Sequence, residues 1–299
     1  MIKTAGGVLW DAMQGMFEDD AFPLAGALAY YSLLSMAPLL LVAVALAGIF
    51  FADGQVHTQL IEQMRRLVGE EGAALTSTVI ANTGSEQRSA WSLALGALLT
   101  LLGASTVFAQ LQYALNRVWR VKAAPRAELI MNFLKHRILS FALVLSVGFL
   151  LMVSLVISAV LGTLHTYLDE RLEEAALFWS ALDLGVAFTL ATVLIAMMFK
   201  YLPDAEIEWR DTWLGALITA ALFIAGKHVI GLYLGQTTVA SSFGAAASVV
   251  IFMIWVYYAA LILLFGAEIT QAVAARRGAL VVPMENAEPA PGPPVPGKP

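Results

Sequence analysis

Residues 241–270 read "SSFGAAASVVIFMIWVYYAALILLFGAEIT", and Glu268 is the only charged side chain among them. An α-helix needs about 20 apolar residues to cross the roughly 30 Å hydrocarbon core of a bilayer, at about 1.5 Å per residue. This stretch is long enough to do so. Of the 299 residues in the chain, 60% are hydrophobic and 13% are charged. A soluble domain could not cover so much apolar surface, so the composition predicts an integral membrane protein.

Apolar runs of this kind recur along the chain. The predicted spans are 22–51, 90–111, 138–162, 177–199, 212–234 and 244–272. We therefore predict an all-α fold, a polytopic membrane protein with six transmembrane helices. Between the first two spans, "VHTQLIEQMRRLV" (56–68) and "GAALTSTVIANT" (72–83) have helical apolar spacing. We expect a short helical extramembrane loop there, either a structured connector or an element for gating or partner docking.

Two flanking segments complete the predicted domain organisation. Residues 1–21 lack the features of a signal peptide and are expected to form an amphipathic interfacial helix. Its apolar face would contain Val8, Leu9, Ala12, Met13, Met16 and Phe17. Residues 22–275 form the predicted six-helix transmembrane domain. Residues 276–299 are expected to form a disordered Pro-rich cytoplasmic tail, because seven of the eleven prolines lie within 283–299.

Lysine and arginine are distributed unevenly between the two sides of the predicted bundle. Twelve of the 17 fall on the side that carries both termini, four fall on the opposite side, and Lys227 lies within a span. Since cytoplasmic loops are enriched in these residues, we expect the N- and C-termini to be cytoplasmic.

The sequence also disfavours several function classes. The chain has no cysteine, which excludes disulfides, thiolate nucleophiles and cysteine-ligated metals. The four histidines are scattered over different loops and helices: His57, His136, His165 and His228. There is no GxxxxGK[ST] motif, no basic stripe for nucleic acid and no evident catalytic constellation within the spans. We therefore expect no enzyme, no cofactor, no metal and no nucleic-acid partner.

Two charged residues are predicted to lie at matching depth in the membrane. Asp183 is about 9 Å and Lys227 about 10 Å from the outer surface, counted along their helices. The pair could lock the fourth and fifth helices together, or it could line a cavity that accepts a polar head group. The lysine could also reach the interface unaided by snorkelling. The neighbouring His228 points about 100° away around the helix.

The first span carries hydroxyl groups beside a proline. Pro38 removes a backbone donor near the middle of this helix, so a kink is expected there. Tyr30, Tyr31 and Ser35 precede it. The serine could bond back to its own helix while the tyrosines lie near the interface, or these groups could line a substrate path along a hinged helix.

A second polar group is predicted on the cytoplasmic side. Gln112, Asn116 and Arg120 follow one another at i, i+4 spacing at the end of the second span. They could hydrogen-bond other helix ends or contact an anionic head group. Glu268 is expected at the cytoplasmic edge, where it is hydrated, paired with an arginine such as Arg210 or Arg120, or part of a proton relay.

Three stretches carry a family resemblance: "AGALAYYSLLSMAPLLL" (25–41), "LQYALNRVW" (111–119) and "WRDTWLGALITAALFIAGKHVIGLYLG" (209–235), which leads into residues 241–270. Together they resemble the YihY/BrkB family of bacterial inner-membrane proteins, over nearly the whole six-helix region. The resemblance implies a multi-pass helical protein of the bacterial cytoplasmic membrane. Some members of this family were named virulence factors, and the family once carried the label ribonuclease BN. The scattered histidines do not support nuclease chemistry.

The features above favour a non-ATP-driven transporter or flippase-like protein for a lipid or other amphipathic envelope molecule. A scaffold that organises an envelope complex through the outer helical loop is the alternative, and an intramembrane enzyme is a third. The expected partners are membrane lipids, with a homo-oligomer or an envelope protein as further options.

Overall fold

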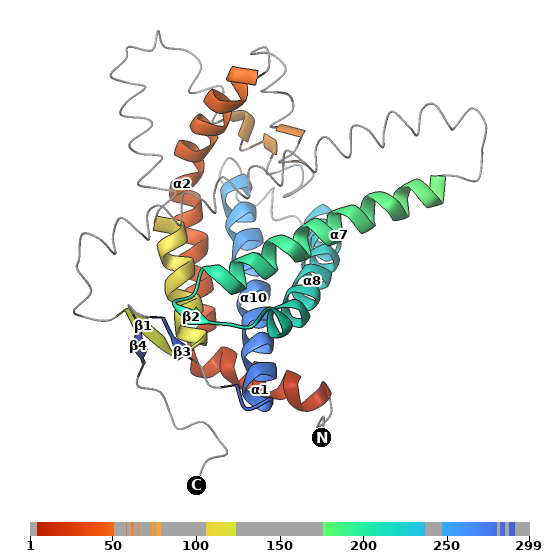
Figure 1. Cartoon of the computed structure of the whole chain (residues 1–299). Helices are drawn as coiled ribbons and strands as arrows, with labels where there is room; N and C mark the ends of the chain where they lie inside the picture. The colour runs from red at the N-terminus through yellow and green to blue at the C-terminus, as the bar shows by residue number, and fades with distance from the viewer. Residues whose placement is uncertain are drawn as a thin grey trace. The chain divides into compact units, whose positions relative to one another are not determined.

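The computed structural model describes residues 5–50, 106–123, 176–236, 247–279, 282–284 and 287–290, together with 58, 61–62, 65, 73–74 and 76–78 (Figure 1). The helices are α1 (Ala5–Glu18), α2 (Ala21–Phe50), α7 (Ala176–Tyr201), α8 (Trp209–Gln236) and α10 (Ala247–Arg276), and residues 106–118 are also helical. The strands are β1 (Val121–Ala123), β2 (Ala205–Glu206), β3 (Val282–Pro283) and β4 (Ala287–Pro289).

Four of these helices match predicted spans to within a few residues. They are α2, α7, α8 and α10, and by length and composition Leu184–Tyr201 and Val249–Arg276 could cross a membrane. The helical class is therefore confirmed. The number of six spans stays a prediction, because the run at 138–162 and most of the run at 90–111 lie outside the described residues. The described positions within 56–83 are helical, as expected for the outer loop.

The chain divides into two compact units. Unit 1 comprises Met1–Gly15, Leu115–Ile224 and Phe265–Pro299, and unit 2 comprises Met16–Ala114 and Ala225–Leu264. Within unit 1, the start of α1, the end of α7, the start of α8 and the end of α10 come together with all four strands. These are the segments that the charge distribution assigned to one side of the membrane. Their common location agrees with that grouping, and which side they face stays a prediction.

In unit 1, α8 and α10 cross through two similar pentapeptides, "GALIT" (215–219) and "GAEIT" (266–270). A methyl group added at Gly215 would lie 2.5 Å from the carbonyl oxygen of Gly266 and closer still to the Thr270 hydroxyl. A methyl group added at Gly266 would overlap the Thr219 hydroxyl. The helix backbones therefore meet directly, as small residues allow in membrane helices.

Both threonines at this crossing satisfy their hydroxyl groups within their own helices. The Thr219 hydroxyl donates to the carbonyl of Gly215 at 2.7 Å, and the Thr270 hydroxyl donates to the carbonyl of Gly266 at 2.9 Å. Both side chains are fully buried. A buried polar group without a partner is costly, and these bonds remove that cost without using the neighbouring helix.

The helix α1 packs on the C-terminal end of α10 through a stripe at i, i+4 spacing (Figure 1). A methyl group at Gly7 would lie 2.6 Å from a guanidinium nitrogen of Arg276, and Gly15 lies directly against the carboxylate of Glu268. Between these glycines, Arg276 Nε donates to Asp11 at 2.7 Å. The two glycines thus let α1 approach charged side chains that larger residues would push away.

The apolar side chains of α1 lie on two opposite faces of the helix. Ala12 and Met16 are buried, and Ala12 packs with Ile269 and Val273 of α10. The opposite face carries large exposed apolar side chains: Leu9, Trp10, Met13 and Phe17. One face of α1 therefore contacts protein while the other is free to contact lipid, and its location at the membrane surface stays a prediction.

The structure describes part of the segment predicted to be a disordered tail. Helix α10 ends at Arg276, and the chain then turns at Gly278, whose φ of 77° is readily adopted only by glycine. Its N–H donates to Ala275 O at 3.0 Å, and Ala279 N donates to Ala274 O at 3.1 Å. This pattern is a Schellman motif, which satisfies the last carbonyl groups of the helix and turns the chain back.

After this turn, the tail pairs with two short strands. β3 pairs antiparallel with β2, and β4 pairs antiparallel with β1. Pro283 and Pro289 are tolerated because each ladder has only two strands, where a missing N–H can face outward. Residues 282–284 and 287–290 thus have backbone partners from distant parts of the chain, and the disordered tail over 276–299 stays a prediction.

In unit 2, α8 and α10 contact each other a second time. Gly226 lies directly against the ring of Tyr258, and Trp255 lies one turn earlier on α10 with its ring centroid 6.3 Å from that of Tyr258. A larger residue at position 226 would displace the tyrosine. A glycine is therefore needed at both described α8–α10 contacts.

The crossing predicts a specific sensitivity to a single methyl group. Gly215→Ala should destabilise the protein by about 1–3 kcal/mol, because the new Cβ meets backbone that cannot rotate away. Gly185→Ala in α7 is the matched control, since a Cβ there meets nothing within 4 Å. Thermal melting of the detergent-purified protein measures both variants. Equal melting temperatures would contradict a backbone contact at Gly215.

Candidate binding pocket at the ends of α7, α8 and α10

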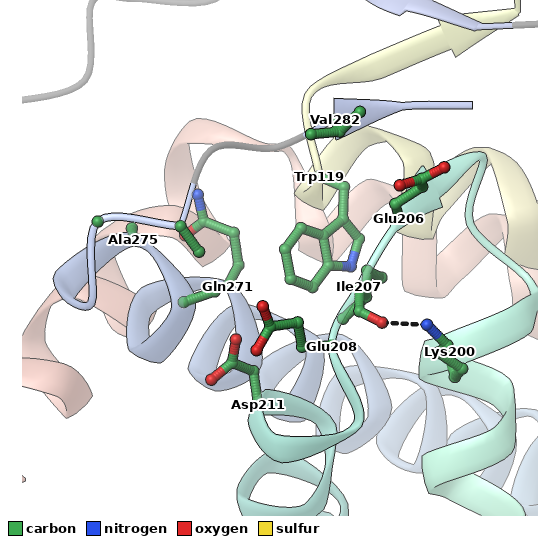
Figure 2. A pocket seen from close by; sticks show the side chains of 12 residues that line it. Trp119, Lys200, Glu206, Ile207, Glu208, Asp211, Gln271, Ala275 and Val282 are labelled. Carbon is green, nitrogen blue, oxygen red and sulfur yellow. Dashed lines mark hydrogen bonds between the residues drawn. The ribbon is translucent and has the colours of Figure 1, made fainter. Parts of the chain in front are cut away.

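A pocket of about 450 Å³ lies in unit 1, where α7 and α10 end and α8 begins (Figure 2). Its apolar wall includes Trp119, Ile207, Ala274 and Val282, and its polar side chains are Lys200, Glu206, Glu208, Asp211 and Gln271. Figure 2 shows Glu208 and Asp211 on the side of Gln271, with Lys200 on the opposite side of the Trp119 indole. The pocket therefore combines an apolar surface with charges of both signs.

The α7–α8 connection that forms one wall is fixed by side-chain bonds. Asn116 Nδ2 donates to the Asp204 carboxylate at 2.7 Å, and the backbone N–H of Asp204 donates to Asn116 Oδ1 at 2.8 Å. Lys200 Nζ donates to the carbonyl of Ile207. These bonds tie the end of α7 and the end of the helical segment 106–118 to one turn, so the wall is pre-formed.

A small hydrophobic cluster supports the base of the pocket. It contains Trp119, Val121, Ala205, Ile207 and Ala274, all nearly or fully buried. The indole nitrogen of Trp119 is buried and has no hydrogen-bond partner within the described part of the chain. A donor at the wall of a pocket can be satisfied by an ordered water or by an acceptor on a bound molecule.

The charges around the pocket differ in how far they are neutralised. Asp211 is 2% exposed and forms an ion pair with Arg277 at the end of α10. Glu208 is largely exposed and lies 3.5 Å from Arg210. Glu206 is exposed and has no ion pair or hydrogen bond with the other described residues. The buried charge is therefore compensated, while the Glu206 carboxylate at the edge stays available.

Aromatic residues mark the outer surface of the same helix ends. The ring of Trp209 lies 5.8 Å from that of Tyr201 and 6.2 Å from that of Trp213, measured between centroids. Each of the three is 40–46% exposed. Tyrosine and tryptophan concentrate at the level of the lipid head groups. Trp209 and Trp213 flank Asp211 in sequence, so these rings and the pocket belong to the same helix start.

The predicted cytoplasmic polar residues are only partly brought together. Asn116 bonds to the α7–α8 connection, as expected for a contact between helix ends, and Gln112 is half-buried on the same helix. Arg120 does not continue their helical face. The helix ends at residue 118, and Arg120 has a φ of 52°, with its carbonyl accepting from Ala290 N at 2.7 Å. Glu268 is 2% exposed beneath α1, so it is not solvated at a helix edge.

The candidates on the first span lie in unit 2 and do not line the pocket. The Ser35 hydroxyl donates to the carbonyl of Ser32 at 3.1 Å, which is the back-bonding expected for a packing role. Tyr30 is 52% exposed, and its ring lies 5.6 Å from that of Tyr31. The helix α2 continues without interruption across Pro38, whose side chain lies outside the described residues.

The charged pair at membrane depth stays a prediction. Asp183 lies on α7 and Lys227 on α8, and the side chains of both lie outside the described residues. Pairing, snorkelling and a cavity therefore remain alternatives. No group of three histidine, aspartate or glutamate residues in the described part of the chain could bind a metal ion.

Sequence reasoning missed the residues that form the pocket. Lys200 and Arg277 were counted as topology signals, and Asp211 resembles an ordinary acidic residue in the first turn of a helix. The aromatic spacing of "WRDTW" (209–213) was the available signal, because it predicts an interfacial helix start with one acidic residue turned inward.

Comparison with known proteins identifies the family. The sequence matches the family described as "Virulence factor BrkB" over residues 12–291. This chain belongs to that family. It is 29% identical over 267 residues to a UPF0761 membrane protein of Legionella pneumophila, covering 87% of this chain and 60% of the relative. No solved structure matches the chain.

Other relatives carry the same description. A UPF0761 membrane protein of Alkalilimnicola ehrlichii is 30% identical over 261 residues, covering 86% of this chain and 56% of the relative. One from Vibrio vulnificus is 28% identical over 257 residues, covering 84% and 77%. The chain thus spans about 60% of the length of the first two relatives. It is an integral membrane protein of the BrkB family.

The buried ion pair predicts unequal roles for neighbouring arginines. Arg277→Met should destabilise the protein by about 1–3 kcal/mol, because it leaves the buried Asp211 carboxylate uncompensated. Arg210→Met should change stability by less than about 0.5 kcal/mol, since its pair with Glu208 is exposed. Thermal melting in detergent compares the two. The double variant Arg277→Met with Asp211→Asn should recover part of the loss, and no recovery would contradict a stabilising ion pair.

Proposed function

We propose that this protein moves a lipid or other amphipathic envelope molecule in the bacterial inner membrane without hydrolysing ATP, and that it is not an enzyme. The observation that carries the proposal is the pocket at the helix ends. Its wall combines an indole and aliphatic side chains with carboxylates and a lysine, which suits a molecule with a polar head and an apolar body.

The location of the pocket supports the same proposal. The exposed aromatic side chains Tyr201, Trp209 and Trp213 belong at the head-group level, where an amphipathic molecule already resides. The exposed apolar side chains of α7 and α8, such as Leu184 and Leu217, are suited to contact with lipid tails. A lipid could therefore reach the pocket from the bilayer without first entering water.

The family membership supports the membrane location, and the sequence supports movement without ATP hydrolysis. Relatives of the chain are described as membrane proteins. The chain contains no GxxxxGK[ST] motif for binding nucleotide phosphates. Movement down a gradient, or movement coupled to an ion or to a partner, is the proposed alternative to ATP hydrolysis.

A lipid-scrambling assay tests the proposal. The protein is reconstituted into vesicles that contain a fluorescent phospholipid, and dithionite added outside bleaches the lipid of the outer leaflet. A protein that moves lipid should allow bleaching beyond the half reached with empty vesicles. Fluorescence that stays at the level of empty vesicles, with and without a proton or sodium gradient, would contradict the proposal.

Filling the pocket should slow this movement. Ala275→Phe adds bulk at the lining of the pocket and should lower the scrambling rate by about tenfold, which corresponds to about 1.4 kcal/mol. Ala187→Phe on α7 is the matched control, because this residue is also exposed on a helix but does not line the pocket. Equal rates for the two variants would show that the pocket is not on the route.

A further inference from the structure

The chemistry of the pocket allows the head group to be narrowed. Three carboxylates and one lysine line it, but Asp211 is already compensated by Arg277. Glu208 lies 3.5 Å from Arg210, so the charges that remain for a ligand are the ammonium of Lys200 and the carboxylate of Glu206. A ligand that carries only negative charge would place that charge beside the Glu206 carboxylate, and a purely cationic ligand would leave Lys200 without a counter-ion.

A phosphate on the ligand suits Lys200. Its ammonium donates one hydrogen bond to the Ile207 carbonyl, which orients the side chain at the wall of the pocket. An ammonium has three donors, so two remain for oxygen atoms of a ligand. Charge-assisted bonds of this kind are the stronger class of hydrogen bond.

A primary amine on the ligand suits the negative charge at the edge of the pocket. Glu206 lies on β2, is exposed at the edge of the pocket and lacks a partner among the described residues. Figure 2 shows it on the same side of the Trp119 indole as Lys200. The C-terminal ends of α7 and α10 also border the pocket, and each contributes partial negative charge. A primary ammonium group could donate to the Glu206 carboxylate.

The apolar wall suits the part of a lipid that follows its head group. Trp119, Ile207 and Val282 offer an apolar surface next to the charged groups. We propose that the pocket binds the head group of an aminophospholipid, with its phosphodiester at Lys200, its primary ammonium at Glu206, and its glycerol against the Trp119 wall. This inference rests on the proposed function, because it names the class of lipid that the site accepts.

Binding of short-chain lipids tests this assignment. The full-length protein in detergent is titrated with dihexanoyl phosphatidylethanolamine, dihexanoyl phosphatidylglycerol and O-phosphoethanolamine, and affinities are measured by calorimetry. The ethanolamine lipid should bind about two- to fivefold more tightly than the glycerol lipid, the range expected for one exposed ion pair. O-phosphoethanolamine, which lacks the apolar part, should bind more weakly than the ethanolamine lipid.

Single variants assign the two charges. Glu206→Gln should abolish the preference for the ethanolamine lipid, whereas Glu288→Gln should keep it, because Glu288 is an exposed carboxylate of the same tail-paired region that does not line the pocket. Lys200→Met should lower the affinity for both lipids by about three- to tenfold, since both carry the phosphodiester. Lys200→Arg retains the positive charge and should preserve most of the affinity. Melting temperatures show whether each variant remains folded.

The outcomes separate this inference from the proposed function. A preference for phosphatidylglycerol would overturn it, because the basic surface rather than the pocket would then control binding. Equal affinity for O-phosphoethanolamine and the ethanolamine lipid would overturn the lipid assignment. If the protein scrambles lipid but shows no head-group preference that depends on Glu206, the proposed function stands and the inference fails. Selective binding without scrambling would support the inference and defeat the proposed function.

Discussion

The direct backbone contact between α8 and α10 sets the geometry of unit 1. Gly215 lies six residues after the start of α8 and Thr270 six residues before the end of α10, about 9 Å along each helix. The contact therefore fixes how far apart the start of one helix and the end of the other can be. Those two helix ends form walls of the pocket, so its shape depends on the close contact that Gly215 and Gly266 allow.

The end of α10 also distributes its charges between two neighbours. Arg276 pairs with Asp11 of α1, and the adjacent Arg277 pairs with the buried Asp211 of α8. Consecutive residues at a helix end point in different directions, so one short segment connects to two helices. The close packing of glycine on α1 and α8 brings these partners within reach. A buried carboxylate that would be costly alone, that of Asp211, is thereby paired.

Long apolar runs made the helices predictable, because more than 20 consecutive apolar residues are typical of a membrane-spanning helix and of little else. The bounds of α2, α7, α8 and α10 follow the predicted spans closely. The contacts between helices were not predictable in the same way. Both "GALIT" and "GAEIT" can be recognised as sequences that favour close packing, but nothing in either one identifies the other as its partner.

The pocket and the tail were missed for a related reason. Asp211 and Arg277 are 66 residues apart, and the strands that order the tail are two or three residues long. Neither feature leaves a periodic pattern in the sequence. Arg120 was misplaced because a helical register was extended two residues too far, past the end at residue 118. Composition alone could not indicate that residues 282–283 and 287–289 pair with distant strands.

The walls of the pocket are held with unequal strength. The α8–α10 crossing is a backbone contact in a buried region, and the α7–α8 connection is fixed by the paired bonds of Asn116 and Asp204. The wall that contains Val282 belongs to the tail, where β2 and β3 pair over two residues only. A two-stranded ladder of this length has little stability of its own. The least costly way to widen the pocket is therefore to displace the tail, since separating the helices would break the contact on which their arrangement depends.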